Sequence, residues 1–129
     1  MLAERRVHAT LPVADLDRAR AFYEGTLGFS PHDVQPTAVL YAAGEGTLFA
    51  ASKGTALASG SHTQMAFTTN DLEAELADAR TRGIVFEEYD FPGFKTVNGI
   101  APVGPNRAAW FKDSEGNLIG IIQFADAGV

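Results

Sequence analysis

His8 is one of the side chains in this sequence that could carry out acid–base chemistry. It lies in RVHATLPV, a stretch whose alternation of polar and apolar residues predicts a half-buried strand. An imidazole with an ordinary pKa near ~6.5 can act as a general base, or orient a bound molecule, at neutral pH. The competing interpretation is a strand residue whose hydrogen bond is satisfied and which has no chemical role.

Trp110 and Phe111 are neighbours on a predicted strand, so one ring faces the core and the other faces the opposite side of the sheet. An aromatic wall could stack a planar ligand, a contact worth about 1 kcal/mol beyond burial. Core packing is the alternative for either ring. Tyr41 and Leu48 are further candidates for such a wall by the same reasoning.

Gly120 interrupts the last predicted strand, in GNLIGIIQF. A glycine in mid-strand often marks a place where another group approaches the backbone closely. The turn before this strand carries Asp113, Glu115 and Asn117. We interpret these three as turn chemistry and not as a catalytic carboxylate pair.

The elements that position these residues occur twice. Arg6–Phe29 and Thr63–Phe86 each predict a strand, a turn and a helix closed by a glycine, Gly28 or Gly83, in the left-handed conformation. The two stretches align at an offset of 56 residues, so Gln64 in the second stretch corresponds to His8 in the first. The Gln64 amide could face a ligand or bond to a neighbouring side chain.

We expect the second helix to be capped by Asn70, with Glu73 completing a capping box. Three strands should follow each helix, at roughly 29–33, 38–42 and 47–52, and at roughly 85–90, 108–112 and 118–124. The organisation is therefore one domain of two βαβββ modules, about 5–53 and about 62–125, joined by a linker at 54–61.

The stretch 91–106 is rich in proline and glycine and is expected to be irregular. It could close over a cleft as a lid or form a dimer contact. Arg107, next to it, could meet an anionic ligand or simply be solvated.

The bulk composition limits the partners. The 129 residues include no cysteine, which excludes disulfides and thiolate-held metals. The net charge of −6 argues against nucleic acid and gives no attraction to anionic membranes. The N-terminus has no apolar stretch of signal-peptide length, so we expect a cytoplasmic protein.

Two motifs resemble one known group. VHATLPVADLDRARAFYEGTLGF at the front and AAWFKDSEGNLIGIIQF at the back are similar to the vicinal oxygen chelate superfamily of glyoxalases, bleomycin-resistance proteins and extradiol dioxygenases. The resemblance implies an α+β fold in which two βαβββ modules form a U-shaped mixed sheet around a cleft, with helices on the outer face. Homodimers are also expected from this resemblance.

The metal-dependent members of that superfamily hold an ion at four positions, which correspond here to His8, Ala50, Gln64 and Gly120. We expect all four to face one cleft, but Ala50 and Gly120 carry no donor atom. The sequence therefore predicts a degenerate metal site with no cofactor, and free volume at the cleft floor.

Three functions remain open on these grounds. The first is a metal-free binder of a hydrophobic or aromatic small molecule in the concave cleft. The second is a lyase, isomerase or dioxygenase that depends on a metal or on His8, and the third is an interaction module without a ligand. The predicted ligand-binding residues are His8, Tyr41, Leu48, Ala50, Gln64, Trp110 and Gly120.

Overall fold

The computed structural model describes residues 1–54, 58 and 62–126. The chain divides into two compact units, Met1–Ala58 (unit 1) and Ser59–Val129 (unit 2). Most of the predicted linker, residues 55–57 and 59–61, lies outside the described residues.

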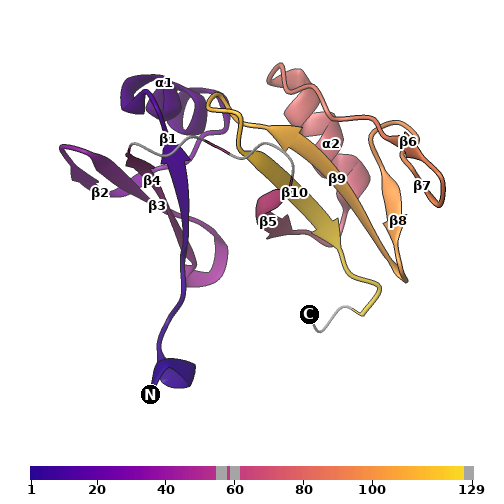
Figure 1. Ribbon diagram of the computed structural model, residues 1–129, viewed down its shortest axis with the longest axis horizontal. Helices are drawn as coiled ribbons and strands as arrows, with labels where there is room; N and C mark the ends of the chain where they lie inside the picture. Colours follow the sequence, from indigo (N-terminus) through magenta and orange to yellow (C-terminus); the bar gives the residue numbers. More distant parts are fainter. Residues whose placement is uncertain (55–57, 59–61, 127–129) are drawn as a thin grey trace. The chain divides into compact units, whose positions relative to one another are not determined.

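Unit 1 is a βαβββ module, as the repeat predicted. Its sheet has the order β1-β4-β3-β2, in which β1 and β4 are parallel and the other pairs are antiparallel (Figure 1). In chain order the elements are η1 (Leu2–Glu4), β1 (Ala9–Val13), α1 (Leu16–Arg20), η2 (Ala21–Thr26), β2 (Pro31–Gln35), β3 (Ala38–Ala42), η3 (Gly44–Gly46) and β4 (Leu48–Lys53).

The first helix begins at a capping aspartate and ends at a glycine. Asp15 accepts a hydrogen bond from the Arg18 backbone N–H at 3.0 Å. The helix then widens into the π-helical turn η2, where the Leu27 N–H reaches the Phe22 carbonyl at 2.9 Å. Gly28 follows with a φ of 80°, the left-handed conformation predicted for it.

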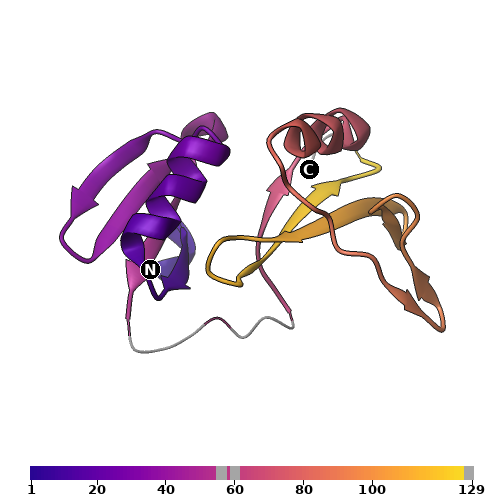
Figure 2. The same cartoon turned by 90° about the horizontal axis from the view of Figure 1, so that it is seen from above.

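Unit 2 repeats the same sheet. Its order is β5-β10-β9-β8, again with a parallel first pair, and α2 covers one face of it (Figures 1 and 2). The remaining elements are β5 (Thr63–Thr68), α2 (Leu72–Thr81), β6 (Asp90–Phe91), β7 (Phe94–Lys95), β8 (Ala101–Val103), β9 (Asn106–Lys112) and β10 (Leu118–Gln123). In the part of the chain that the structure describes, no helix has the length and apolar character needed to cross a membrane.

The cap of α2 differs from the prediction. Asp71, and not Asn70, is the N-cap residue, and its carboxylate accepts from the Ala74 N–H at 3.1 Å. Glu73 pairs with the Arg107 guanidinium on β9. With Asp71 as the N-cap, the third helical position is Ala74, so Glu73 is not placed to complete a capping box.

The predicted strand at 85–90 is also wrong. Only Phe86 pairs with β9, as an isolated bridge to Phe111. The Tyr89 backbone is instead bonded to Thr96, whose N–H donates to the Tyr89 carbonyl at 2.9 Å and whose hydroxyl accepts from the Tyr89 N–H at 2.7 Å. The first strand of the four-stranded sheet after α2 is instead β8, which lies at the edge of that sheet.

The stretch 91–106 is therefore ordered into turns and short strands. β6 and β7 form a hairpin at the outer end of unit 2, and Val97 and Ile100 form a second, tight turn (Figure 1). Arg80 on α2 donates to the Asn98 carbonyl at 2.9 Å and so holds this turn against the helix. These contacts replace the irregular segment expected from its composition.

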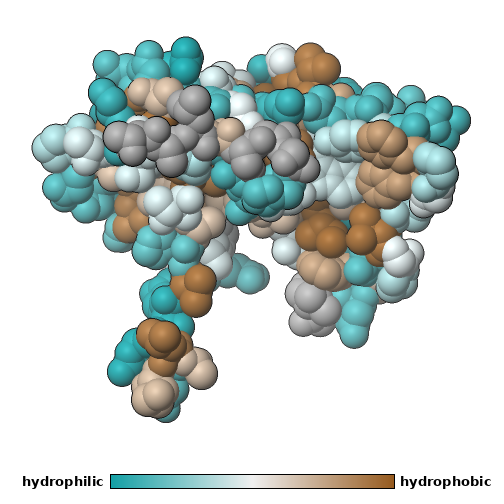
Figure 3. All heavy atoms as spheres, in the orientation of Figure 1, coloured by the Kyte–Doolittle hydropathy of each residue, from teal (hydrophilic) through white to brown (hydrophobic). Residues whose placement is uncertain are grey.

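Hydrophobic side chains are exposed at the N-terminal end of unit 1, as Figure 3 shows around η1. Met1 and Leu2 belong to this end, and Val7 just before β1 is 90% exposed. Strand alternation with Ala9 and Leu11 predicts that Val7 packs toward the helix. Its position outside the paired part of β1 explains the difference.

Candidate functional site

The strand register supports the correspondence between the two modules. Ala50 on β4 pairs with Thr10, two residues after His8. Gly120 on β10 pairs with Ala66, which lies two residues after Gln64. In each module, the predicted position on the last strand therefore pairs with the residue two places after the predicted position on the first strand. A common cleft for all four residues remains a prediction.

In unit 1 the structure brings His8 and Leu48 together. His8 is exposed and lies immediately before β1, and Leu48 is half-buried at the start of β4. Arg6 closes the same region by donating to the Gly46 carbonyl. The residues around this hollow of about 260 Å³ are Arg6, Val7, His8, Thr47 and Leu48.

Tyr41 lies elsewhere, in the helix-side core of unit 1. Its ring is fully buried between the rings of Tyr23 and Phe49, at centroid distances of 5.7 and 5.3 Å. Its hydroxyl donates to Glu24 at 2.9 Å, and burial raises the pKa of this hydroxyl. The expected ligand-wall role does not fit this placement, because alternation turns Tyr41 to the same side as Phe49.

In unit 2, Gly120 makes room for Trp110. The indole N–H of Trp110 on β9 donates to the Thr63 hydroxyl on β5 at 3.0 Å, and β10 lies between these two strands. A methyl group on Gly120 would lie 3.3 Å from Thr63 Cγ2, 3.4 Å from Ala66 Cβ and 3.5 Å from Trp110 Nε1. The volume expected to be free at position 120 is therefore occupied by the indole and by Thr63.

Trp110 belongs to an aromatic cluster on one face of the unit 2 sheet. Its ring centroid lies 5.6 Å from that of Phe94 and 6.0 Å from that of Tyr89, and Tyr89 stacks on Phe91 at 6.0 Å. Burial, and secondly the charge of Glu87, raises the pKa of the Tyr89 hydroxyl, which therefore stays protonated at neutral pH. We call Tyr89, Phe91, Phe94 and Trp110 the Trp110 cluster.

This cluster lies on the face of the sheet that points away from α2. Arg107 on β9 bonds to α2, so alternation turns Arg107, Ala109 and Phe111 toward the helix and Trp110 to the other side. The sequence signal for the cluster is YDFPGF, where a Pro-Gly turn between aromatic residues indicates a hairpin that gathers its rings.

Gln64 lies where the pairing of β5 and β10 is irregular, between the pairs Thr63–Leu118 and Met65–Ile119. Its side-chain oxygen is buried and has no hydrogen-bond partner among the described residues. A buried amide oxygen without a hydrogen-bond partner is unfavourable.

The donor atoms at the four predicted positions do not fit a divalent ion. Ala50 and Gly120 have none, and the space beside Gly120 is filled by Thr63 and Trp110. A hard cation requires several oxygen or nitrogen ligands, and a neutral amide with one imidazole gives two. Within the described residues, no group of three or more His, Cys, Asp or Glu side chains is arranged to hold a metal.

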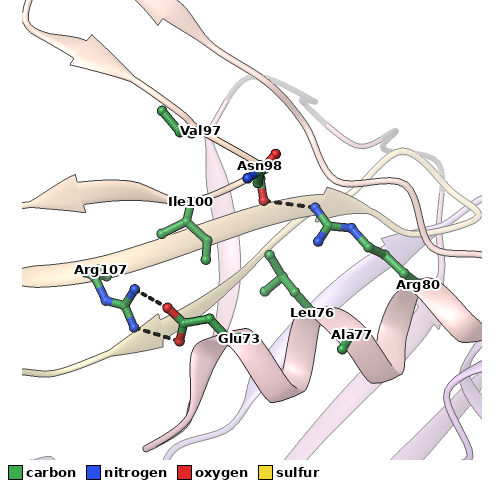
Figure 4. Close-up of a pocket in the computed structure, with 8 residues that line it drawn as sticks. All are labelled: Glu73, Leu76, Ala77, Arg80, Val97, Asn98, Ile100 and Arg107. Carbon is green, nitrogen blue, oxygen red and sulfur yellow. Dashed lines mark hydrogen bonds and ion pairs between the residues drawn. The ribbon is translucent and has the colours of Figure 1, made fainter.

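A second hollow, of about 490 Å³, lies on the α2 side of unit 2 (Figure 4). Arg107 lies at this hollow, where it forms two hydrogen bonds with the Glu73 carboxylate, at 2.5 and 2.9 Å, while its side chain stays 40% exposed. This bonding lowers the pKa of Glu73 to about 2. The lining residues are Glu73, Leu76, Ala77, Arg80, Val97, Asn98, Ile100 and Arg107.

Solved structures with the same fold include antibiotic-binding and glyoxalase-type proteins. TnmS3, an antibiotic binding protein from Streptomyces sp. CB03234, is 25% identical over 95% of this chain and 98% of its own, with a TM-score of 0.69. UcmS2 is 20% identical over 92% of this chain and 96% of its own, with a TM-score of 0.70, a level of identity that supports the fold alone.

A glyoxalase/bleomycin resistance protein from Streptomyces sp. CB03234 is 25% identical over 91% of this chain and 98% of its own, with a TM-score of 0.64. The comparison with curated proteins gave no match. The profile of the Glyoxalase/Bleomycin resistance protein/Dioxygenase superfamily matches residues 5–121. The chain therefore belongs to the glyoxalase/bleomycin resistance protein/dioxygenase superfamily.

Proposed function

We propose that this protein binds a hydrophobic or aromatic small molecule on the sheet face that carries the Trp110 cluster, without a bound metal ion and without turnover. The observation that carries the proposal is the half-buried indole of Trp110, held over Gly120 and flanked by Tyr89 and Phe94. Aromatic side chains with a few placed polar groups are the usual lining of a small-molecule site. The similar structure TnmS3, an antibiotic binding protein, supports a small-molecule ligand.

The Tyr89 hydroxyl, which is protonated at neutral pH, is a proposed polar contact of the ligand. Gln64 is a second one, although its side-chain oxygen is buried and would have to become exposed. His8 and Leu48 line the hollow of unit 1, and their contact with a ligand stays a prediction. A binder of this kind uses shape and stacking for affinity and needs no proton transfer.

The binding test uses the only tryptophan in the chain as its reporter. A library of aromatic and hydrophobic compounds that includes antibiotics is screened by quenching of Trp110 fluorescence. Hits are then measured by calorimetry and checked by mass spectrometry for chemical change. We expect at least one unmodified ligand, with Trp110→Ala weakening it about tenfold through loss of stacking and apolar contact.

The matched control is Val85→Ala, because Val85 is an apolar residue of the same unit that is 82% exposed. It should leave affinity unchanged. Equal affinity in Trp110→Ala would contradict the site, and a chemically altered ligand would favour an enzyme. Near-stoichiometric metal in protein purified without chelators would contradict the metal-free form of the proposal.

We also propose a cytoplasmic homodimer. The edge strands β2 and β8 leave backbone groups that a second copy could cover. Light scattering coupled to gel filtration should give twice the 13.7 kDa chain mass. A mass of one chain at micromolar concentration would contradict this assembly.

A further inference from the structure

We infer that Thr63 is a positioning residue that locks the Trp110 indole across Gly120 and thereby makes the site selective for flat aromatic rings. The inference rests on the proposed function for its ligand and on the geometry of unit 2 for the lock. The three residues lie on three neighbouring strands, β5, β10 and β9.

The lock depends on one hydrogen bond and one missing side chain. The Trp110 indole N–H donates to the Thr63 hydroxyl at 3.0 Å, which fixes the orientation of the ring plane. The bond crosses β10 at Gly120, where an added methyl group would lie 3.5 Å from Trp110 Nε1 and 3.3 Å from Thr63 Cγ2. Any longer side chain at position 120 would have to displace the indole or Thr63.

The orientation matters because the face of the indole is not stacked. Tyr89 and Phe94 meet it at interplanar angles of 73° and 60°, so among the described residues no ring lies parallel to it. A flat ring can therefore stack on the indole while its edge contacts the rings beside it. The N–H is already bonded to Thr63, so the indole offers a ligand its π surface and no hydrogen bond.

A fixed ring improves affinity because less rotational freedom is lost on binding. The benefit is specific to ligands that need a parallel stacking surface. A puckered saturated molecule of the same size gains only apolar contact, which a mobile indole supplies equally well. Loss of the lock should therefore reduce the preference for planar molecules.

The lock can be measured without any ligand. Since the chain has one tryptophan, its indole N–H gives one proton–nitrogen resonance in labelled protein. We expect Thr63→Val to increase exchange of this proton with solvent at least tenfold, and Thr63→Ser to restore the slow rate. Thr68→Val is the matched control, because Thr68 is an exposed threonine on the same strand, and it should leave the rate unchanged.

The selectivity is measured with 1-naphthol and its saturated analogue 1-decalol in the same variants. Thr63→Val should weaken 1-naphthol about fivefold, as expected for loss of one neutral hydrogen bond, and leave 1-decalol within twofold. An unchanged exchange rate in Thr63→Val overturns the lock whatever the ligands do. Fast exchange with an unchanged ratio of the two affinities overturns the selectivity while the proposed function stands, since that function is tested separately by the library screen, the Trp110→Ala variant and the metal content.

Discussion

The two modules share a topology but place their larger aromatic clusters on opposite sides of the sheet, although Phe86 and Phe111 of unit 2 also pack toward α2. In unit 1, Tyr23, Tyr41 and Phe49 pack together on the helix side and are at most 2% exposed. In unit 2, Trp110 and Tyr89 gather on the side away from α2 and are half-buried. The first arrangement stabilises a core, and the second leaves part of the aromatic surface exposed.

The register identifies the residues behind this difference. Leu40 pairs with Ala50 in unit 1 as Trp110 pairs with Gly120 in unit 2. Unit 1 thus has an aliphatic residue opposite alanine where unit 2 has a tryptophan opposite glycine. A methyl group at position 120 would lie 3.5 Å from Trp110 Nε1, which is an ordinary contact, and 3.3 Å from Thr63 Cγ2, which is a tight one.

The largest expected effect compares Tyr41 with Trp110. Tyr41→Ala should lower the free energy of unfolding by about 3–5 kcal/mol, because it removes a fully buried ring. Trp110→Ala should lower the free energy of unfolding by only about 1–2 kcal/mol, because the Trp110 side chain is half-buried and so loses less buried apolar surface. Urea denaturation followed by circular dichroism measures both, since tryptophan fluorescence is lost in the second variant.

Tyr41→Phe is the control for that comparison. It keeps the ring and removes the hydroxyl that donates to Glu24, so we expect a loss of about 1–2 kcal/mol. If Trp110→Ala proved as destabilising as Tyr41→Ala, the Trp110 cluster would be a second core and the contrast between the modules would disappear.

A middle-sized effect distinguishes the turns that lead into the last strand of each module. The Asp113 carboxylate is buried and accepts from the N–H groups of Glu115 and Asn117, at 2.9 and 2.8 Å, and from the Asn117 amide at 2.8 Å. Asp113→Ala should cost about 2–3 kcal/mol, because it leaves buried donors without an acceptor.

The equivalent turn in unit 1 is held less tightly. Thr47, which is exposed, donates from its hydroxyl to the Gly44 carbonyl at 2.6 Å. Thr47→Ala should therefore cost only about 0.5–1 kcal/mol. Equal losses in chemical denaturation would show that the buried carboxylate does not distinguish the two turns.

The repeated pattern predicted the fold because its signals are local. An apolar helix face and a closing glycine recur in both modules, and the interpretation of Asp113 as turn chemistry is confirmed by its bonds to Glu115 and Asn117. Strand alternation predicted correctly that Trp110 and Phe111 face opposite sides of the sheet, but it did not predict which ring faces the helix.

The sequence could not predict contacts that join distant positions. Thr63 and Trp110 are 47 residues apart, and nothing local to either residue indicates their hydrogen bond. The Thr96 contacts that divert the Tyr89 backbone from β9 are side-chain bonds across a turn, so propensity alone favoured a strand there. The sequence shows that Gly120 has no donor atom for a metal ion. It does not show that Thr63 and Trp110 lie beside Gly120.

The smallest expected effect compares the ion pairs of the two modules. In unit 1, Arg20 pairs with Glu24 one turn along the same helix at 2.7 Å, and the Tyr41 hydroxyl also bonds to Glu24. In unit 2, Arg107 on β9 pairs with Glu73 on α2 and so joins the strand to the helix. Hydrogen bonding to Arg107 is the main cause that lowers the pKa of Glu73, to about 2.

A lowered carboxyl pKa contributes stability above the unfolded value of about 4.5 and loses it as the pH falls toward 2. Glu73→Gln should therefore flatten the fall in unfolding free energy between about pH 4.5 and pH 2, and Arg107→Gln should flatten the same window. Glu24 is present in all three proteins, so its own lowered pKa cancels from their differences. Because both partners are largely exposed, salt should shrink the effect, and an unchanged pH slope in Glu73→Gln would mean that the pair does not join β9 to α2 in solution.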